Sequence, residues 1–419
     1  MVTLQLQNSY SEVHTTMRGV TLVLTVLVLL ASLVSYPAHA QTLTPLYSFT
    51  GAADGANPYA SLLLDAKGSL YGTTALGGNP GCFTNNGCGI VFKVDPAGHA
   101  TVLYTFTGGA DGANPFSSLI RVHGALYGTT AKGGDTDDGT VFKVETRGKQ
   151  LGQETVVHSF KLDGADGASP DTGGLIRDRD GNTFGTTIDG GEFLHGTVFK
   201  IDTTVHETVL YSFTGTGGDG ATPDSRLARD KSGNLYGTTL QGGSHSSGTV
   251  FMIDPSGHET VLYSFLGADG DGNRPAGGVV RDGRGNLYGT TAFGGAFGLG
   301  TVFKLDVTGH ETVLYSFAGG TDGAVPQAGL LRFHGDFYGT TNRGGDQSCS
   351  GGGCGIIFKV DRAGNETILH TFHLTDGGFP AASLVHDKLG NLYGTTVGGG
   401  NTGCQPGLGG CGTVFKLTP

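Results

Sequence analysis

The feature that most restricts the fold of this chain is a sequence unit that returns seven times along its 419 residues. A Tyr-Gly-Thr-Thr segment begins at Tyr71 and recurs at intervals of 50–57 residues, once with Phe184 in place of the tyrosine. A Gly-Thr-Val-Phe-like segment and a Leu-Tyr-Ser-Phe-like segment also occur seven times each. A chain of this kind repeats one supersecondary unit, and neighbouring copies bury their apolar faces against one another.

Each unit contains four short segments rich in β-branched and aromatic residues and bounded by Gly, Asp, Asn or Pro. In the first unit they predict strands over residues 61–65, 69–74, 89–95 and 101–106. The turns between them suit tight antiparallel hairpins, and no helical period of useful length appears after residue 40. Four-stranded sheets repeated around an axis predict an all-β fold, a seven-bladed β-propeller.

The two ends of the chain complement each other. Residues 46–49 form a Leu-Tyr-Ser-Phe segment ahead of the first full unit, whereas the last unit ends soon after Phe415 and lacks a fourth strand. We expect the N-terminal strand to pair with the last blade and close the ring, because closure removes two exposed strand edges. Residues 41–419 are therefore predicted to form a single propeller domain.

The first 40 residues have the pattern of a secretory signal peptide. An apolar run over residues 19–34 follows Arg18 and precedes an Ala-x-Ala ending at residue 40. The run is short for a membrane span, which needs about 20 residues, and Met17 is an alternative true start. We expect a mature chain that begins at Gln41, has no transmembrane segment and is extracellular or periplasmic.

The repeated segments also carry a family resemblance. Asn-Leu-Tyr-Gly-Thr-Thr, then Gly-Gly, then Gly-Thr-Val-Phe-Lys resembles the Gloeo/Verruco (GloVer) tandem repeat of exported bacterial proteins, over about residues 43–418. The resemblance implies a propeller-like exported protein, and it carries over no activity and no catalytic residue. Many relatives end in a surface-sorting anchor. This chain ends in Leu-Thr-Pro, so we expect release or periplasmic residence rather than attachment.

All six cysteines fall in loops between the second and third strands, in units one, six and seven. Export, an even number and local spacing predict three disulfides, which are Cys82–Cys88, Cys349–Cys354 and Cys404–Cys411. Zinc binding is the alternative, but no paired histidine accompanies the cysteines, so we expect no metal. The disulfides would stiffen one sector of this face for binding or simply protect long loops.

Antiparallel order places the loops after the second and fourth strands on one face, here called the top face. Its interblade loops carry Asp-Gly-x-x-Pro in every unit. The seven aspartates could hold cations or bind a polymer, although an Asp that caps its own turn is the simpler interpretation. They are Asp54, Asp111, Asp166, Asp219, Asp271, Asp322 and Asp376. Calcium binding by these aspartates is therefore an alternative to turn capping, and no cofactor is predicted.

A second set of equivalent positions lies on the first strand of each unit. Arg occupies five of the seven positions, and an inward-facing ring of guanidiniums could clamp an acidic ligand. The alternatives are pairing with turn acids or stacking on tyrosines of the next blade. The predicted binding residues are Arg121, Arg177, Arg229, Arg281, Arg332 and His386, and the first unit has Leu64 instead.

Catalysis normally requires residues that break the repeat, because an acid and a base need different environments. Two top loops contain such residues, the first with Asp189, Glu192 and His195 and the second with Asp135, Asp137 and Asp138. The first group is a candidate for a glycosidase or polysaccharide lyase, and the second for ligand binding. Against an enzyme, Glu is scarce after residue 40, no activated Ser or Cys motif appears, and tryptophan is absent.

Three His-Glu-Thr segments and one Asn-Glu-Thr segment lie in hairpins between the third and fourth strands, where a solvated turn is expected. They begin at His206, His258, His310 and Asn365. The net charge of −11 argues against a nucleic-acid partner. The sequence thus predicts a monomeric, exported binding or structural module whose partner is an extracellular glycan or protein. The alternative is a carbohydrate-active enzyme with its site on the top face.

Overall fold

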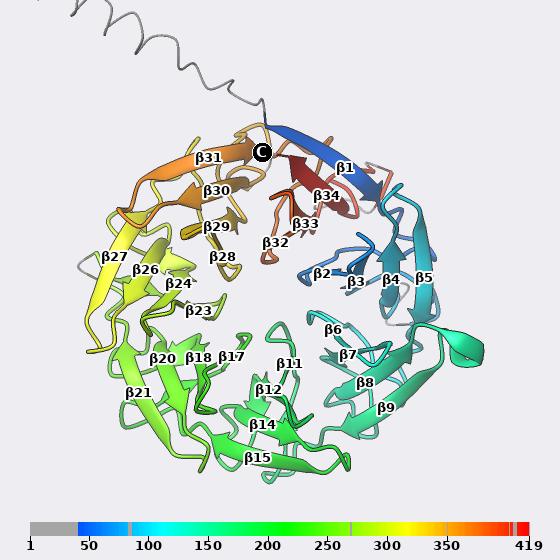
Figure 1. Cartoon of the computed structure of the whole chain (residues 1–419), viewed down its shortest axis with the longest axis horizontal. Helices are drawn as coiled ribbons and strands as arrows, with labels where there is room; N and C mark the ends of the chain where they lie inside the picture. The colour runs from blue at the N-terminus through cyan, green and yellow to red at the C-terminus, as the bar shows by residue number, and fades with distance from the viewer. Residues whose placement is uncertain are drawn as a thin grey trace, which may run out of the picture. The chain divides into compact units, whose positions relative to one another are not determined.

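In the computed structural model, the seven repeats form seven four-stranded antiparallel sheets arranged in a ring, as Figure 1 shows for the compact unit Thr42–Thr418. The predicted fold, an all-β seven-bladed β-propeller, is confirmed. The structure describes residues 41–82, 86–268, 270–349, 351–401, 403–404 and 409–418. The predicted signal segment 1–40, with Met17, lies outside the described residues.

The blades are numbered in chain order, and the strands of each run from the inside of the ring to the outside. Blade 1 has β2 (Leu63–Leu64), β3 (Leu70–Thr74), β4 (Ile90–Val94) and β5 (Ala100–Thr105). Blade 2 has β6 (Ile120–Val122), β7 (Ala125–Thr130), β8 (Thr140–Glu145) and β9 (Glu154–Ser159). Blade 3 has β11 (Ile176–Arg177), β12 (Thr183–Thr187), β14 (Thr197–Ile201) and β15 (Glu207–Ser212). Blade 4 has β17 (Ala228–Arg229), β18 (Leu235–Thr239), β20 (Thr249–Ile253) and β21 (Glu259–Ser264).

Blades 5 to 7 repeat the pattern. Blade 5 has β23 (Val279–Arg281), β24 (Leu287–Thr291), β26 (Thr301–Leu305) and β27 (Glu311–Ser316). Blade 6 has β28 (Leu331–Phe333), β29 (Asp336–Thr341), β30 (Ile356–Val360) and β31 (Glu366–Thr371). Blade 7 has β32 (Val385–His386), β33 (Leu392–Thr396), β34 (Thr413–Thr418) and, outermost, β1 (Thr42–Ser48).

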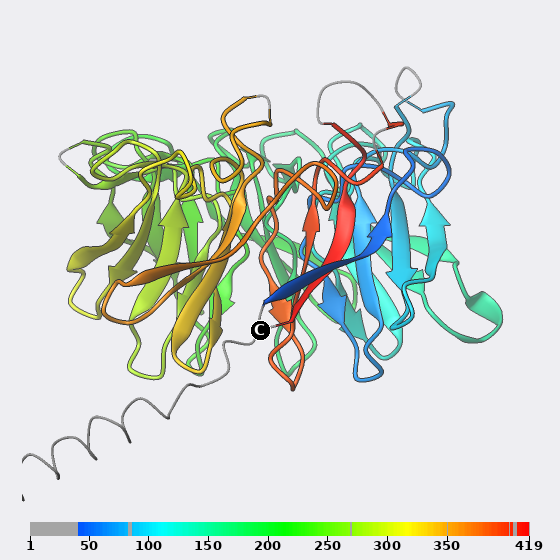
Figure 2. The same cartoon turned by 90° about the horizontal axis from the view of Figure 1, so that it is seen from above.

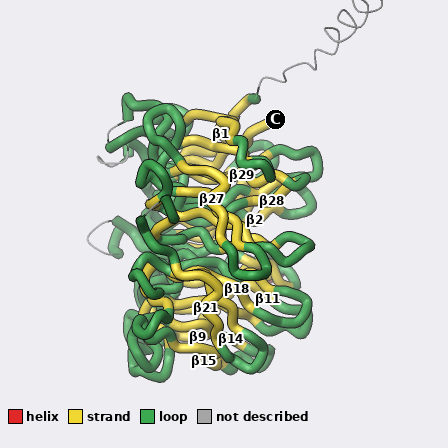
Figure 3. The backbone as a smooth tube through the Cα atoms, turned by 90° about the vertical axis from the view of Figure 1, so that its left-hand side faces the viewer, coloured by secondary structure: helices red, strands yellow, loops and turns green. Residues whose placement is uncertain are grey.

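Small elements in the loops complete the fold. Three two-residue ribbons brace top loops, and one 3-10 turn, η1 (Gly148–Gln150), precedes β9. The ribbons pair β10 (Gly167–Ala168) with β13 (Asp189–Gly190), β16 (Gly220–Ala221) with β19 (Gln241–Gly242), and β22 (Gly272–Asn273) with β25 (Phe293–Gly294). Figure 3 shows the loops gathered at the two ends of the strands. Among the described residues, no helix is long and apolar enough to cross a membrane.

The innermost strand is shorter than predicted. Residues 61–65 were expected to be extended and paired, but β2 contains only Leu63–Leu64. The residues before it bond to the next blade instead of to β3, since Ser61 N donates to Ser118 Oγ at 3.2 Å. Near the axis of the ring, neighbouring blades come close enough for such contacts to replace ladder hydrogen bonds. The other three strands of the unit agree with prediction to within one residue.

The N-terminal strand closes the ring as predicted. β1 pairs antiparallel with β34, with Leu43 opposite Leu417 and Ser48 opposite Thr413. The two strands lie side by side in Figure 2, in blue and red. The strand β1 is thus the fourth strand of the last blade, and it covers the edge of β34 that would otherwise be left unpaired.

The repeated motifs have a direct packing explanation. The Gly of each Tyr-Gly-Thr-Thr segment lies opposite the Phe of the next strand, as Gly72 does with Phe92. A Cβ added to Gly72 would come 2.6 Å from Cζ of Phe92, so only glycine leaves room for the ring. The second Thr of the segment commonly bonds to the first residue of the next strand, as Thr187 Oγ1 does with Thr197 Oγ1 at 2.9 Å.

Phenylalanine pairs join each blade to the next. The Phe that follows each outer strand is buried and packs edge to face on the third-strand Phe of the following blade, with ring centroids 5.0–5.2 Å apart. The seven pairs are Phe49–Phe92, Phe106–Phe142, Phe160–Phe199, Phe213–Phe251, Phe265–Phe303, Phe317–Phe358 and Phe372–Phe415. Edge-to-face geometry is the favoured arrangement for such rings. The core therefore runs around the ring, between blades.

Candidate functional site

The predicted basic residues lie on the innermost strands. Arg121, Arg177, Arg229 and Arg281 are on β6, β11, β17 and β23, Arg332 is on β28, and His386 is on β32. These strands line the inside of the ring in Figure 1. The first strand of each blade is therefore innermost, which is the position that a ring of basic residues around the channel would require.

Most of these side chains stack on an aromatic ring of the preceding blade, whereas stacking on the next blade was the alternative expected. Arg121 lies 4.9 Å from the ring of Tyr71, and Arg281 lies 5.7 Å from that of Tyr236. Arg177 and Arg229 lie 6.0 and 5.8 Å from Tyr127 and Phe184 in the same way. His386 packs on Phe333 at 4.1 Å, but Arg332 has no ring contact or ion pair among the described residues.

Two of the arginines also meet turn acids of the preceding blade. Arg121 Nη1 donates to Asp65 Oδ2 at 3.2 Å, and Arg229 Nη2 is 3.8 Å from Asp178 Oδ2. Burial acts to raise the pKa of Asp65, but hydrogen bonds from the backbone of Ser69 and Lys67 and from Arg121 outweigh it and lower the pKa. The carboxylate stays charged, so Arg121 is held in place by both an aromatic face and an anion.

A cavity of about 440 Å³, largely open to solvent, lies on the bottom face between the hairpins that connect the first and second strands of blades 2 and 3. Its chemistry is mostly basic, with three arginines and a histidine against two aspartates. The charged and titratable lining residues are Arg121, His123, Arg177, Asp178, Arg179 and Asp180. Guanidiniums match carboxylate, sulfate and phosphate geometry with paired hydrogen bonds. Two of the predicted arginines thus converge on one hollow, and Arg179 and His123 join them.

A carboxyl pair at the inner edge of the top face was missed by the sequence analysis. Asp171 and Asp224 each follow directly the Pro that ends an interblade loop, just before the inner strands of blades 3 and 4. Thr172 joins them, because its backbone N and its Oγ1 donate to Asp224 Oδ1 at 3.0 and 2.7 Å. Asp171 Oδ1 is buried without a hydrogen-bond partner.

Desolvation dominates the electrostatics of this pair. Burial, and then the charges of Asp224 and Asp189, raise the pKa of Asp171 to about 7. Burial also raises the pKa of Asp224 to about 6, although the hydrogen bonds from Thr172 act in the opposite direction. Two carboxyls coupled in this way titrate as a pair and not as independent acids.

Aromatic residues occupy the equivalent positions in blades 1 and 2. The rings of Tyr59 and Phe116 lie 5.3 Å apart, edge to face. Burial, and then the charge of Asp171, raise the pKa of Tyr59. The signal was present in the sequence. The residue after the Pro varies among the seven units and is acidic in only two of them, so comparing the units at that position would have singled out Asp171 and Asp224.

The residues predicted for catalysis lie on an exposed top loop. Asp189, Glu192 and His195 all have exposed side chains, and no hydrogen bond or ion pair within the described residues joins the three. Asp189 is close enough to Asp171 to raise the pKa of that residue. Of the three, only Asp189 is therefore connected to the carboxyl pair.

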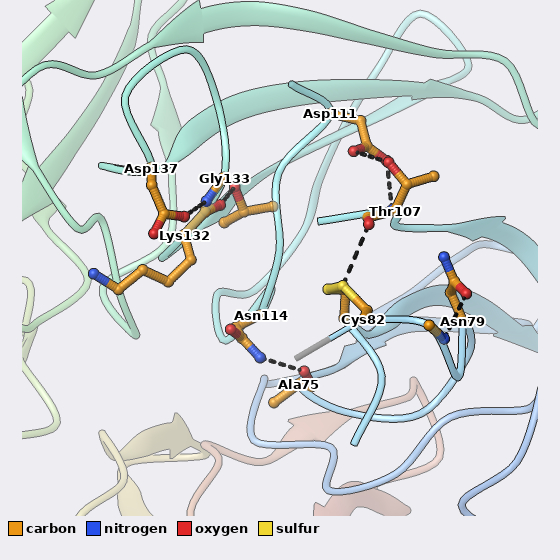
Figure 4. Close-up of a disulfide and its surroundings, with 12 residues drawn as sticks. Ala75, Asn79, Cys82, Thr107, Asp111, Asn114, Lys132, Gly133 and Asp137 are labelled. Atoms are coloured by element: carbon orange, nitrogen blue, oxygen red, sulfur yellow. Dashed lines mark hydrogen bonds between the residues drawn. A yellow bond between two sulfur atoms is a disulfide. The ribbon is translucent and has the colours of Figure 1, made fainter. Parts of the chain in front are cut away.

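The acids of the second predicted loop mainly brace backbone. Asp137 Oδ1 accepts a hydrogen bond from Gly133 N at 2.8 Å, which Figure 4 shows. Asp138 Oδ2 accepts from Leu162 N at 3.0 Å, so it links this loop to the following interblade loop. Asp135 is exposed, and its backbone N donates to Ser159 Oγ. These contacts stiffen the loop.

The aspartates of the interblade loops cap their own turns, which is the simpler of the two interpretations. Asp111 accepts hydrogen bonds from Thr107 N at 2.7 Å and from Tyr104 Oη at 2.9 Å. Tyr47 donates to Asp54 in the same way, and burial followed by this bond raises the pKa of Tyr47 to about 12. The Asp and the aromatic residue of the Leu-Tyr-Ser-Phe segment therefore form one rim contact.

The three predicted disulfides are present, and they leave no cysteine free. Their Cα atoms are 5.5–5.6 Å apart, and all three lie in the top loops of the adjacent blades 6, 7 and 1. In Figure 4, Sγ of Cys82 lies against the carbonyl oxygen of Thr107, at 3.3 Å. Disulfides are typical of proteins outside the cytosol, which agrees with the expected export.

The His-Glu-Thr segments differ from expectation. His206 is exposed as a solvated turn residue would be, but Glu207 begins β15 and its Oε1 is buried without a hydrogen-bond partner. The same holds for the other outer-strand glutamates, Glu154, Glu259, Glu311 and Glu366. Burial, and then a nearby interblade Asp, raise the pKa of each to about 7.

Solved structures of low sequence identity share the propeller fold. A fungal alcohol oxidase of the AA5 family, in complex with copper, has a TM-score of 0.56 at 15% identity, over 91% of this chain and 77% of its own. A puromycin hydrolase mutant complexed with PGG has a TM-score of 0.51 at 10% identity, over 83% and 52%. At such identities the similarity concerns the fold alone.

A third similar structure is the extracellular domain of a hybrid two-component system from B. thetaiotaomicron, with a TM-score of 0.54 at 11% identity. The match covers 88% of this chain, which spans only 40% of that one. No curated protein matches the chain. The model of the Gloeobacter/Verrucomicrobia repeat matches residues 32–177 and 150–352, which confirms the resemblance carried by the repeated segments. The chain therefore belongs to the Gloeobacter/Verrucomicrobia repeat family.

Proposed function

We propose that this protein is an exported binding module that takes an acidic glycan, bearing carboxylate or sulfate groups, into the cavity between the bottom hairpins of blades 2 and 3. The observation that carries the proposal is the convergence of Arg121, Arg177 and Arg179 on a hollow of about 440 Å³. The chain as a whole is acidic, with a net charge of −11. A local basic cavity on such a chain is a selective position for an anion.

The arginines are held ready for a ligand. Arg121 and Arg177 rest on tyrosine rings, so little side-chain freedom is lost when a carboxylate binds. Of the two aspartates in the lining, the exposed Asp180 can accept hydrogen bonds from sugar hydroxyls, whereas the side chain of Asp178 is buried and already accepts from Asn182. Together they suit a ligand that combines acidic groups with hydroxyls.

The test is calorimetric titration of the protein with an oligogalacturonate and with a neutral oligosaccharide of equal length. Binding of the acidic oligomer alone, weakening as salt rises, is expected. Arg177→Ala should reduce the affinity by about tenfold or more, as loss of a charged hydrogen-bond pair does. Arg332→Ala is the matched control, because Arg332 occupies the equivalent position outside the cavity. Equal binding of both sugars, or equal losses in both variants, would contradict the proposal.

A second candidate function, a carbohydrate-active enzyme, is favoured by the pair Asp171 and Asp224. Carboxyls whose pKa values are about 7 and 6 can donate and accept protons near neutral pH. New reducing ends from a polysaccharide, lost in Asp171→Asn and retained in Glu192→Gln, would support this function. Retention of a bound polysaccharide without new reducing ends would favour the binding module.

A further inference from the structure

At the outer rim, every blade has a contact between an aromatic side chain and an aspartate, and the aromatic residue is not the same in all blades. An aromatic residue near the end of each outer strand donates to the Asp of the following interblade loop, and this residue is tyrosine in five blades. Histidine replaces tyrosine twice. His158 Nε2 lies 3.0 Å from Asp166 Oδ2, and His370 Nε2 lies 3.1 Å from Asp376 Oδ2.

The outer strand of the following blade adds a third residue beside each contact. In five blades this residue is a glutamate, and the charge of the preceding interblade Asp raises its pKa. In the two remaining blades the equivalent residue is apolar. It is Ala100 in blade 1, opposite Val94, and Leu43 in blade 7, opposite Leu417. Histidine and glutamate therefore coincide at one junction of the described ring, between blades 2 and 3.

We propose that His158, Asp166 and Glu207 form a binding site for a divalent transition-metal ion, Zn²⁺ or Mn²⁺, at the rim between blades 2 and 3. One imidazole nitrogen and two carboxylate oxygens are ligands that both ions accept. The ligand atoms of the three residues all lie within 4.8 Å of one another. Neighbouring ligands about 2.1 Å from one ion are about 3–3.5 Å apart, and His158 and Asp166 already have that spacing.

The surroundings of the three residues suit an ion. Glu207 Oε1 is buried and has no hydrogen-bond partner, so a cation would supply the interaction that it lacks. The His158 ring is fixed edge to face against Phe160 at 4.7 Å, which orients Nε2. The side chains of His158 and Asp166 are 21% and 14% exposed to solvent. This exposure leaves a path for the ion and room for water as a further ligand.

The ring supplies its own comparisons. At His370 the same histidine–aspartate contact faces the strand that carries Leu43 in place of a glutamate. At Tyr211 the aspartate and glutamate are both present, as Asp219 and Glu259, but a neutral phenol replaces the imidazole. If His158 were only a substitute for tyrosine in a structural contact, all three junctions would behave alike toward metal ions.

The test is titration of the chelator-treated protein with Zn²⁺ and with Mn²⁺, monitored by calorimetry, and with Co²⁺, monitored by the visible absorption of the bound ion. One ion per chain at micromolar affinity is expected. Changes outside the direct ligands of metal sites cost about 10–100-fold in affinity, so His158→Tyr should cost more. His158→Tyr should remain folded, since tyrosine occupies this position in five blades. His370→Tyr is the control and should bind metal unchanged.

A gain-of-site variant makes the test independent of any loss of stability. Tyr211→His places an imidazole beside Asp219 and Glu259, and two ions per chain are expected. All six cysteines are in disulfides and do not compete for the ion. If the parent protein binds none of zinc, manganese and cobalt, or if His158→Tyr and His370→Tyr weaken binding equally, the proposal is overturned.

Discussion

The ring of Phe49 lies edge to face on the ring of Phe92, with centroids 5.1 Å apart. Phe49 follows the first strand of the chain, which belongs to blade 7, whereas Phe92 belongs to blade 1. The same pairing joins blade 6 to blade 7 through Phe372 and Phe415. The junction that closes the ring thus has the same core contact as the six other junctions. Blades 7 and 1 therefore pack against each other through the same pair of rings as any other two neighbouring blades.

Removing the closing contact should destabilise the whole ring. Phe49→Ala leaves a cavity beside Phe92 in a fully buried position, and such truncations typically cost about 3–5 kcal/mol of unfolding free energy. Equilibrium denaturation followed by circular dichroism measures the loss. Phe297→Ala is the control, because Phe297 is 61% exposed and its removal should change the stability little. Similar stabilities of the two variants would show that the closing junction is not part of the cooperative core.

The glycines opposite the core phenylalanines should tolerate no side chain. A Cβ at position 237 would come 2.5 Å from Cζ of Phe251, and the buried ring has no space to retreat. Gly237→Ala should therefore destabilise the protein by about 1–3 kcal/mol, as overpacking does. Gly283→Ala is the matched control, since nothing lies within 4 Å of its added Cβ. A thermal scan of the two variants compares them, and equal midpoints would contradict the packing explanation of the motif.

The outer-strand glutamates should make the protein less stable as the pH rises through neutrality. Burial raises the pKa of Glu259 to about 7 from the ordinary value of 4.5, with the charge of Asp219 as the second cause. A carboxyl whose pKa is raised in the folded state contributes stability below its unfolded pKa, and this contribution is lost as the pH rises through about 7. The thermal unfolding midpoint of the protein should accordingly decrease as the pH is raised from 5 to 8.

Substitution separates this effect from other titrations. Glu259→Gln keeps the shape but removes the charge, so it should stabilise the protein at pH 8 and change little at pH 5. The exposed Glu192 is the control, and Glu192→Gln should leave the pH profile unchanged. A stability that is flat from pH 5 to pH 8, or a profile that Glu259→Gln does not alter, would contradict the prediction.

The disulfides should stabilise top loops individually. Cys82 and Cys88 are six positions apart, and closing so short a loop contributes about 2 kcal/mol in the chain-entropy description. The double variant Cys82→Ser/Cys88→Ser should lose about that amount, measured by denaturation under oxidising conditions. The parent protein in reductant should lose more, because it loses all three bonds. A double variant as stable as the parent would show that this loop is held by its other contacts.

Much of the fold could be predicted because its information is local and repeated. Strand boundaries outside β2, the number of blades and the pairing of β1 with the last blade all follow from motifs that can be aligned by eye. The disulfide partners follow from spacing within single loops. The innermost strand was overestimated, because contacts such as that of Ser61 with Ser118 join two blades and leave no periodic trace in one unit.

The candidate sites depended on the tertiary structure for the same reason. The charge of Asp224 acts on Asp171, and ligand atoms of His158 and Glu207 lie within 4.8 Å, in each case across a blade boundary and about 50 residues apart in the sequence. Burial then decides their chemistry, since the same carboxyl is an ordinary acid in water and a proton donor near neutral pH between packed blades. The sequence by itself thus determined the ring, its closure and its disulfides, which rest on repeated local patterns. Only the packing of one blade against the next decided which carboxyls are buried, which rings the arginines cover and where His, Asp and Glu come together.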